Sequence, residues 1–134
     1  MIEEEIKKIL SDFKSIAVVG ISPKEDRPSY LVASYLKSKG YRIIPVRPDG
    51  DEILGEKVYH RLTEIPEGIG VDVVDIFRRS EDVPPIVDEA IRRGAKVVWM
   101  QEGVLHKEAA EKAEKAGLKV VMDRCMKKEH QRLL

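Results

Sequence analysis

The sequence predicts an α/β fold with a doubly wound, mainly parallel sheet of five to six strands and helices on both of its faces. Two observations predict it. Short apolar runs rich in Val and Ile alternate with amphipathic segments, an order typical of parallel strands joined by right-handed helical crossovers. The runs are almost continuously apolar, as are strands buried on both faces. The length of 134 residues suits one core, so we expect residues 1–134 to form a single domain.

Three elements are expected before residue 41. Apolar residues recur at helical spacing over residues 2–13, which predicts an amphipathic helix. The β-branched run 15–20 predicts a buried strand that ends in a glycine. The next helix is expected to begin near Pro28, since proline is tolerated in a first turn, and to end at Gly40.

The second strand is expected at residues 41–46. Pro45 lies near its end, and a proline in a central strand would cost a ladder hydrogen bond, so this strand either stops there or lies near an edge. Residues 47–57 are polar and predict a loop, followed by a short strand over 57–59 and a turn of helix over 62–65.

The rest of the chain continues the alternation of strands and helices. Ser80 is expected to be the N-cap of the next helix, which Gly94 ends. Asp75 shares a strand face with apolar neighbours and is expected to be partly buried, and Trp99 is expected in the core. The other expected elements are strands at residues 71–77, 95–100 and 118–122 and helices at 106–116 and about 125–133.

Composition and charge exclude several classes of function. The chain has 24 acidic and 24 basic side chains, so its zero net charge gives no reason to expect binding to nucleic acid or to an anionic membrane. No apolar run approaches the ~20 residues that span a bilayer, and the acidic N-terminus is unlike a signal peptide. The single cysteine, Cys125, cannot form an internal disulfide and indicates a reducing cytoplasm. The lack of asparagine and the abundance of Glu, Lys and Arg resemble the composition of thermophile proteins.

The loop after the first strand is the first candidate site. Ligands of such sheets bind beyond the carboxyl ends of the strands. Gly20 permits a tight turn and a close approach of a ligand to the backbone, and the helix that starts near Pro28 offers free N–H groups to an anion. Ser22 and Ser29 add hydroxyl donors. A phosphate-binding loop is one interpretation, and a plain strand-to-helix connection is the other.

Arg47, after the second strand, bears on the kind of ligand. Domains that bind NAD place an Asp or Glu here to hold the ribose 2′-hydroxyl. A guanidinium instead favours a phosphorylated ribose, such as that of NADP or of coenzyme A, and a solvated surface arginine is the alternative. Arg78 and Arg79, after the third strand, offer two more cations at this edge. On one interpretation, one of them faces a phosphate, while the other faces solvent or pairs with Glu81.

The sequence contains no recognisable group of catalytic residues and no recognisable group of metal ligands. The three histidines are scattered and lack the spacing of metal ligands. Cys125 has basic neighbours that favour a reactive thiolate, and an inert buried thiol is the alternative. Asp75 is either a base near the phosphate site or a structural hydrogen-bonding group.

Six segments, in order and without a large gap, carry a resemblance to a known family: IAVVGIS (16–22), RPSYLVASYLKSKGYRIIPVRP (27–48), EILGEKVYHRLTEIP (52–66), VDVVDIFRRSEDVPPIVDEAI (71–91), GAKVVWMQEGV (94–104) and GLKVVMDRCMKKEH (117–130). With them, nearly the whole chain after residue 14 resembles the CoA-binding domain family in its small stand-alone form. The chain is more distantly similar to the N-terminal domain of the succinyl-CoA synthetase alpha subunit and to ADP-forming acyl-CoA synthetases.

The resemblance implies a Rossmann-like domain that binds coenzyme A (CoA), with the ADP part across the middle of the sheet edge. The contacts it implies are Gly20, Ile21 and Ser22 at the pyrophosphate, Arg27 and Ser29 beside the phosphates, Val46, Arg47 and Pro48 at the adenosine, Phe77, Arg78 and Val83 at the groove centre, and Gln101 and Gly103 along the pantetheine. Arg47 departs from the family pattern, which often has Asn before this proline, so the ribose side is expected to be held differently.

Three functions follow as alternatives. The first is a protein that binds CoA or acyl-CoA without catalysis of its own, either as a homodimer or with an acyl-CoA enzyme as partner. The second is an NADP-dependent oxidoreductase, against which the short length speaks, because such enzymes usually add a substrate domain. The third is a detached CoA-binding subunit of an ADP-forming acyl-CoA synthetase. The synthetase's phosphorylated histidine and ATP-grasp segment have no counterpart in the sequence, so ligase chemistry is not carried over.

Overall fold

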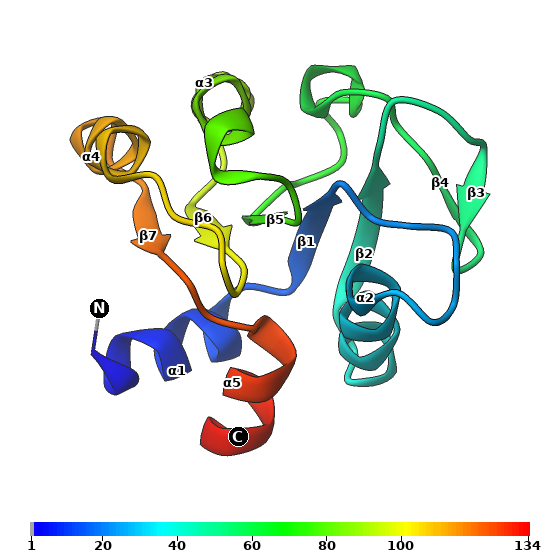
Figure 1. Ribbon diagram of the computed structural model, residues 1–134, viewed down its shortest axis with the longest axis horizontal. Helices are drawn as coiled ribbons and strands as arrows, with labels where there is room; N and C mark the ends of the chain where they lie inside the picture. The colour runs from blue at the N-terminus through cyan, green and yellow to red at the C-terminus, as the bar shows by residue number, and fades with distance from the viewer. Residues whose placement is uncertain (1) are drawn as a thin grey trace.

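The computed structural model describes residues 2–134 and contains a five-stranded parallel sheet with helices on both faces (Figure 1). The predicted α/β fold with a doubly wound parallel sheet is confirmed. The strands lie in the order β2-β1-β5-β6-β7. Their bounds are Ser15–Val19 for β1, Arg42–Val46 for β2, Val73–Ile76 for β5, Val97–Met100 for β6 and Lys119–Val121 for β7.

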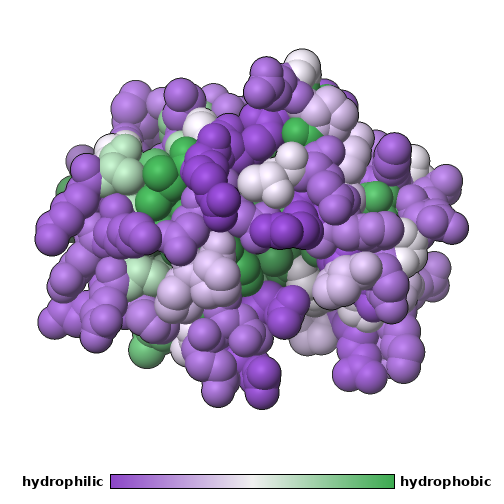
Figure 2. All heavy atoms as spheres, turned by 90° about the horizontal axis from the view of Figure 1, so that it is seen from above, coloured by the Kyte–Doolittle hydropathy of each residue, from purple (hydrophilic) through white to green (hydrophobic). Residues whose placement is uncertain are grey.

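Two layers of helices cover the sheet (Figure 1). On one face lie α1 (Glu3–Asp12), α2 (Pro28–Ser38) and α5 (Met126–Leu133). On the other lie α3 (Val83–Arg93) and α4 (Lys107–Lys115). Each layer has its own apolar core against the sheet, and the strands supply alternate side chains to the two cores because successive strand residues point to opposite faces. Polar side chains cover most of the outer surface seen from above (Figure 2).

The strand order reverses direction next to β1. The chain leaves β1 through α2 and returns as β2 on one side, whereas β5 pairs with β1 on the other side and leads through α3 and α4 to β6 and β7. The two crossovers therefore lie on opposite faces, and a crevice opens between them at the carboxyl ends of β1 and β5. In sheets of this kind, ligands bind at that crevice.

Pro45 lies in β2, which is an edge strand, as one of the two interpretations of this proline required. The segment 47–57, expected to be a loop, also contains a small antiparallel hairpin, β3 (Glu52–Ile53) and β4 (Glu56–Lys57). Its two turn residues, Leu54 and Gly55, both have positive φ, which matches the twist of a tight hairpin. The strand predicted over 57–59 is reduced to the end of β4 and one bridge from Tyr59 to Val46.

The prediction that Ser80 caps the helix after β5 is wrong. A short 3-10 helix, η2 (Ser80–Asp82), comes first, and α3 begins at Val83 with Asp82 at the N-cap. The Ser80 hydroxyl instead accepts a hydrogen bond from the backbone N–H of Leu105, at 3.0 Å. The Ser80 oxygen that would cap the helix therefore binds the loop after β6 instead. The helical turn expected at 62–65 is present as η1 (Leu62–Glu64).

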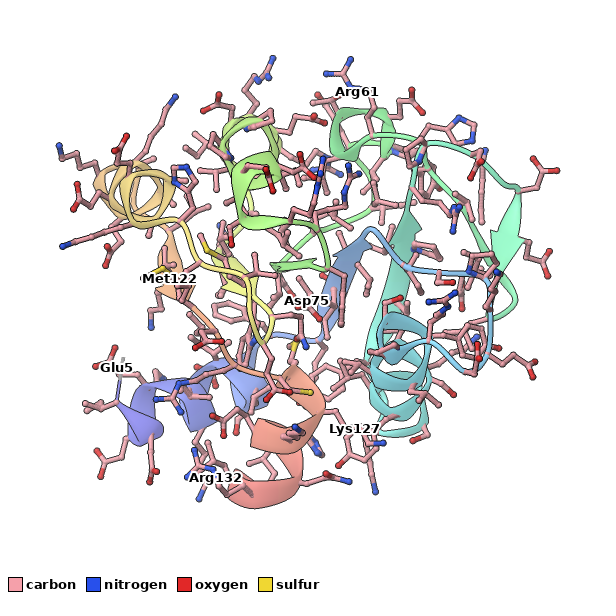
Figure 3. All side chains as sticks on the ribbon, in the orientation of Figure 1. Glu5, Arg61, Asp75, Met122, Lys127 and Arg132 are labelled. Atoms are coloured by element: carbon pink, nitrogen blue, oxygen red, sulfur yellow. The ribbon has the colours of Figure 1, made fainter. Side chains whose placement is uncertain are left out.

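Asp75 is more deeply buried than its strand pattern predicted. The residue lies in the middle of β5 at the centre of the molecule, with 0% of its surface exposed (Figure 3). Neither carboxyl oxygen has a hydrogen-bond partner within the described residues. Burial raises the pKa of Asp75 well above its ordinary value, because the charged form is not solvated there. Trp99, the neighbour of Asp75 on β6, is fully buried as expected, and its indole N–H donates to the Arg124 carbonyl at 2.7 Å.

No helix in the described part of the chain is both long and apolar enough to cross a membrane.

The buried carboxyl predicts how stability depends on pH. Above the ordinary carboxyl pKa, the unfolded state releases the Asp75 proton while the folded state keeps it, so the free energy of unfolding falls as pH rises towards the raised pKa. We expect Asp75→Asn to remove this slope of at most about 1.4 kcal/mol per pH unit. Urea unfolding of the unmodified protein and of Asp75→Asn between about pH 4.5 and 7.5 measures this slope. The contributions of the other titrating groups cancel when the two free energies of unfolding are subtracted. Parallel stability curves would show that Asp75 ionises in the folded state.

Candidate ligand-binding groove

A groove of about 840 Å³ opens along the carboxyl ends of the strands, and we call it the edge groove. The loops after β1, β2, β5 and β6, the first turns of α2 and the residue before α5 form its walls. It is lined by Gly20, Ser22, Pro23, Lys24, Arg27, Pro28, Ser29, Val32, Arg47, Phe77, Arg78, Arg79, Asp82, Gln101, Glu102, Gly103, Val104 and Cys125.

Most of the candidate residues lie in these walls. They are Gly20, Ser22, Arg27, Ser29, Arg47, Phe77, Arg78, Gln101 and Gly103. Ile21 and Val83 are fully buried behind them. Val46 and Pro48 line a neighbouring cavity of about 110 Å³, whose walls Arg47 and Arg78 share with the edge groove. The five segments that follow the strands are thus brought to one edge.

Gly20 follows β1 and lies close against the backbone that follows β5. Its φ of +87° is one that residues with a side chain rarely adopt. A Cβ atom here would lie 2.3 Å from the Phe77 carbonyl oxygen and 2.7 Å from Cδ of Arg78. The Gly20 N–H donates to the Val46 carbonyl at 2.8 Å, so the backbone of this residue also fixes the end of β2. Only glycine fits this position without displacing β5.

The loop from Ser22 to the start of α2 is closed by its own hydroxyl groups. The Ser22 N–H donates to Oγ of Ser29 at 2.9 Å, and the Lys24 N–H donates to Oγ of Ser22 at 3.1 Å. Each hydroxyl accepts these bonds and keeps its proton for a further acceptor. The first hydrogen bond into α2 runs from Leu31 to the Arg27 carbonyl, so the N–H groups of the first turn remain open to an anion.

Arg47 bridges the loops that follow β1 and β2. Its Nη1 donates to the Ile21 carbonyl at 3.0 Å, and its Nε and Nη2 contact Oδ1 of Asp49 at 2.9 and 2.8 Å. The Arg47 side chain is 25% exposed, whereas the Asp49 side chain is 79% exposed. Arginine has five N–H donors, so the bridge leaves donors for a ligand.

Cations outnumber carboxylates around the edge groove. The cationic side chains are Lys24, Arg27, Arg47, Arg78 and Arg79, and the carboxylates are Asp82 and Glu102. Asp82 contacts both Arg78, at 3.4 Å, and Arg79, at 3.5 Å, and Arg79 also lies 3.7 Å from Glu81 as one interpretation of the sequence expected. Glu102 is paired with Lys128 at 2.9 Å. A chain without net charge therefore presents a groove that attracts anions.

The other end of the groove is built by the loops that follow β6 and β7. Gln101 is only 4% exposed, and its Oε1 accepts a hydrogen bond from the Met126 N–H at 3.0 Å. The Gly103 N–H donates to Oδ1 of Asp123 at 2.7 Å, which ties the two loops together. Cys125 lines the groove beside Gln101 and is 8% exposed. Gln101, Gly103 and Cys125 carry no charge and Glu102 is paired with Lys128, so we call this the neutral end, in contrast to the cationic end formed by the lysine and arginine side chains.

Several residues that line the edge groove were not predicted from the sequence as site residues. Lys24 belongs to a charged loop whose fold could not be read from its pattern. Asp82 follows Ser80 at the expected start of a helix, and Glu102 follows a strand but carries the wrong charge for a phosphate site. Residues 2–134 hold no group of three His, Cys, Asp or Glu side chains placed to bind a metal ion.

The comparisons with known proteins agree with this architecture. The family model described as CoA binding domain matches residues 14–131. The chain is 44% identical over 126 residues to "Uncharacterized protein YneT" of Bacillus subtilis, which covers 94% of this chain and 92% of that protein. It superposes on a solved structure described as a hypothetical protein from Pyrococcus horikoshii OT3 with a TM-score of 0.94 and 43% identity, over 99% of this chain and 92% of that one.

A larger enzyme contains a related segment. The chain is 30% identical over 89 residues to the ADP-forming acetate–CoA ligase of Methanocaldococcus jannaschii, which covers 66% of this chain but only 12% of the ligase. This protein thus belongs to the CoA-binding domain family and is related to part of ADP-forming acetate–CoA ligases.

The close approach at Gly20 predicts an unusually costly substitution. Gly20→Ala introduces a strained φ, worth about 1–2 kcal/mol, and forces β5 and the Arg78 side chain to move, which adds about 1–3 kcal/mol. Gly40→Ala is the matched control, since Gly40 has a φ of +93° but nothing within 4 Å of an added Cβ. We expect urea unfolding to show a larger loss of stability for Gly20→Ala. Equal losses would mean that the loop relaxes freely around position 20.

Proposed function

We propose that this protein binds CoA, free or acylated, in the edge groove, with the ADP part at the cationic end and the pantetheine arm at the neutral end. The observation that carries the proposal is the set of five cationic side chains that line the groove, from the loop before α2 and the loops after β2 and β5. A phosphorylated dinucleotide-like ligand matches it, because helix N-termini and arginines bind phosphate oxygens. Membership of the CoA-binding domain family supports the choice of CoA.

The pyrophosphate is assigned to the loop between β1 and α2. The missing side chain at Gly20 lets a phosphate approach the backbone of Ile21 and Ser22. Arg27 and Ser29 flank this position at the start of α2, where open N–H groups and a hydroxyl proton meet the anion. Phosphate contacts of this kind hold the ligand without any covalent step.

The 3′-phosphate of the ribose is assigned to Arg47. The Ile21 carbonyl and Asp49 hold the guanidinium in place, so little side-chain entropy is lost when a phosphate binds. Val46 and Pro48 border the adenosine beside it. NAD-binding domains have a carboxylate at this strand end, which would repel a ribose phosphate.

The pantetheine arm is assigned to the centre and the neutral end of the groove. Phe77 supplies an apolar surface there, and Val83 backs the central part from the core. Gln101 and Gly103 offer polar groups to the amides of the arm. On this assignment Phe77, Gln101 and Gly103 bind and orient the arm.

The relation to ADP-forming acetate–CoA ligases favours one second candidate, in which the chain is the CoA-holding part of a multi-chain acyl-CoA enzyme. Both candidates need the same groove and differ in the partner. The lone thiol of Cys125 fits a reducing compartment such as the cytoplasm. A homodimer of this chain is the alternative to assembly with an acyl-CoA enzyme.

Calorimetric titration with CoA, 3′-dephospho-CoA, NADP and NAD tests the proposal. We expect CoA to bind most tightly. Arg47→Gln should weaken CoA binding about tenfold, since a charge-assisted hydrogen bond contributes roughly 1.5–3 kcal/mol. The same substitution should leave the weaker binding of 3′-dephospho-CoA unchanged.

Arg92→Gln is the matched control for this titration, because Arg92 is an arginine on the outer side of α3, away from the edge groove. It should change neither affinity. Binding of NADP without CoA would contradict the proposal and favour the oxidoreductase interpretation. Equal losses of CoA and 3′-dephospho-CoA affinity in Arg47→Gln would show that Arg47 does not bind the ribose phosphate.

A further inference from the structure

Cys125 is a thiol that faces the ligand groove. It is the only cysteine of the chain, and its side chain contributes to the groove lining although just 8% of the residue is exposed. A buried thiol in an apolar core is usually inert, but this one is reached from the groove. A ligand bound in the groove would therefore contact the Cys125 thiol and keep other thiols away from it.

Three hydrogen bonds fix the position of this thiol. The chain after β7 turns back across the end of β6, where the Arg124 N–H donates to the Met100 carbonyl at 3.3 Å. The Trp99 indole N–H holds the Arg124 carbonyl, and the Met126 N–H is held by Gln101. The backbone on both sides of Cys125 is thus anchored to β6, next to the neutral end of the edge groove.

Gln101 gives an independent indication of what lies beside the thiol. Because Met126 presents an N–H, the side-chain oxygen of Gln101 must face it, which turns the amide Nε2 away. Gln101 is 4% exposed and lines the groove, and no hydrogen bond within residues 2–134 uses its Nε2. This atom is not among the fully buried polar atoms that lack a partner, so it is reached from the groove. A donor that is open to the groove can bind a ligand acceptor, such as an amide carbonyl. A ligand arm with amides that ends in sulfur places both groups correctly.

We propose that Cys125 captures the ligand covalently by thiol–disulfide exchange with an oxidised, disulfide form of the CoA-type thiol. This inference rests on the proposed function, since it requires the same ligand in the same groove. The Cys125 thiol loses its proton to water, and the thiolate attacks one sulfur of the ligand disulfide. The new bond joins Sγ of Cys125 to that sulfur, the old S–S bond breaks, and the other half leaves as a thiolate. No separate oxidant is needed.

The start of α5 lies next to the reacting sulfur. Cys125 precedes the first turn of this helix, where Gln101 binds the Met126 N–H and the next two N–H groups have no intrahelical acceptor. Lys128, three residues further along the chain, is paired with Glu102 at 2.9 Å. Lys127 is turned elsewhere, towards α2, where its Nζ lies 5.5 Å from the centre of the Tyr35 ring (Figure 3). The leaving thiolate departs through the open groove.

Intact-mass spectrometry of the reduced, desalted full chain tests the capture. The protein is mixed with CoA disulfide or, separately, with glutathione disulfide, and the adduct is followed over time. We expect one CoA per chain, formed at least tenfold faster than the glutathione adduct and reversed by dithiothreitol. Because the chain has one cysteine, an adduct in the unmodified protein reports on Cys125 without any variant. Adenosine 3′,5′-bisphosphate, which has no thiol, should slow the CoA reaction by occupying the groove.

A relocated thiol is the matched control. Ser11→Cys in a Cys125→Ser background places the thiol on the exposed side of α1, and we expect it to react without preference for the CoA disulfide. Equal rates for both disulfides in the unmodified protein, no adduct, or no slowing by the bisphosphate would overturn the capture. Calorimetry under reducing conditions separates the two claims: if CoA binds but is not captured, only this inference fails. If CoA does not bind, the proposed function fails as well.

Discussion

The closeness of the backbone at Gly20 is the constraint on which the rest of the site depends. No side chain fits between this residue and the Phe77 carbonyl. The Gly20 N–H holds the end of β2, and the Phe77 N–H donates to the Val19 carbonyl at 2.8 Å, so three strand ends are joined within one hydrogen-bonded cluster. This arrangement brings Arg47 and Arg78 to the same groove. A wider gap would separate the cations and leave no common place for a phosphate.

Electrostatics within the groove depend on carboxylates as well as on cations. Asp49 orients Arg47, and Asp82 holds Arg78 and Arg79. These pairs are partly exposed, so they contribute little to stability by themselves. Their effect is to hold the guanidinium groups near the groove before a ligand arrives. On the proposed function, a phosphate would meet cations whose positions are largely set, in a chain without net charge.

The fold could be predicted from local patterns, and the details of the site could not. Apolar runs identify the five strands, and Pro45 indicates an edge, because these signals act within a few residues. The hairpin β3–β4 has strands of two residues, too short for any periodicity. Ser80 looks like a helix cap until the loop after β6 takes its oxygen, and the full burial of Asp75 results from packing on both sides of β5. Contacts between distant segments decide such features, and a sequence pattern does not contain them.

The central claim is that the loop between β1 and α2 holds the pyrophosphate of CoA. A crystal structure of the reduced protein with CoA tests it most directly. The account predicts a pyrophosphate against the backbone of Gly20 and Ser22 at the start of α2, with the ribose phosphate at Arg47 and the thiol beside Cys125. A ligand bound at another edge of the sheet, or with its phosphates away from this loop, would contradict it.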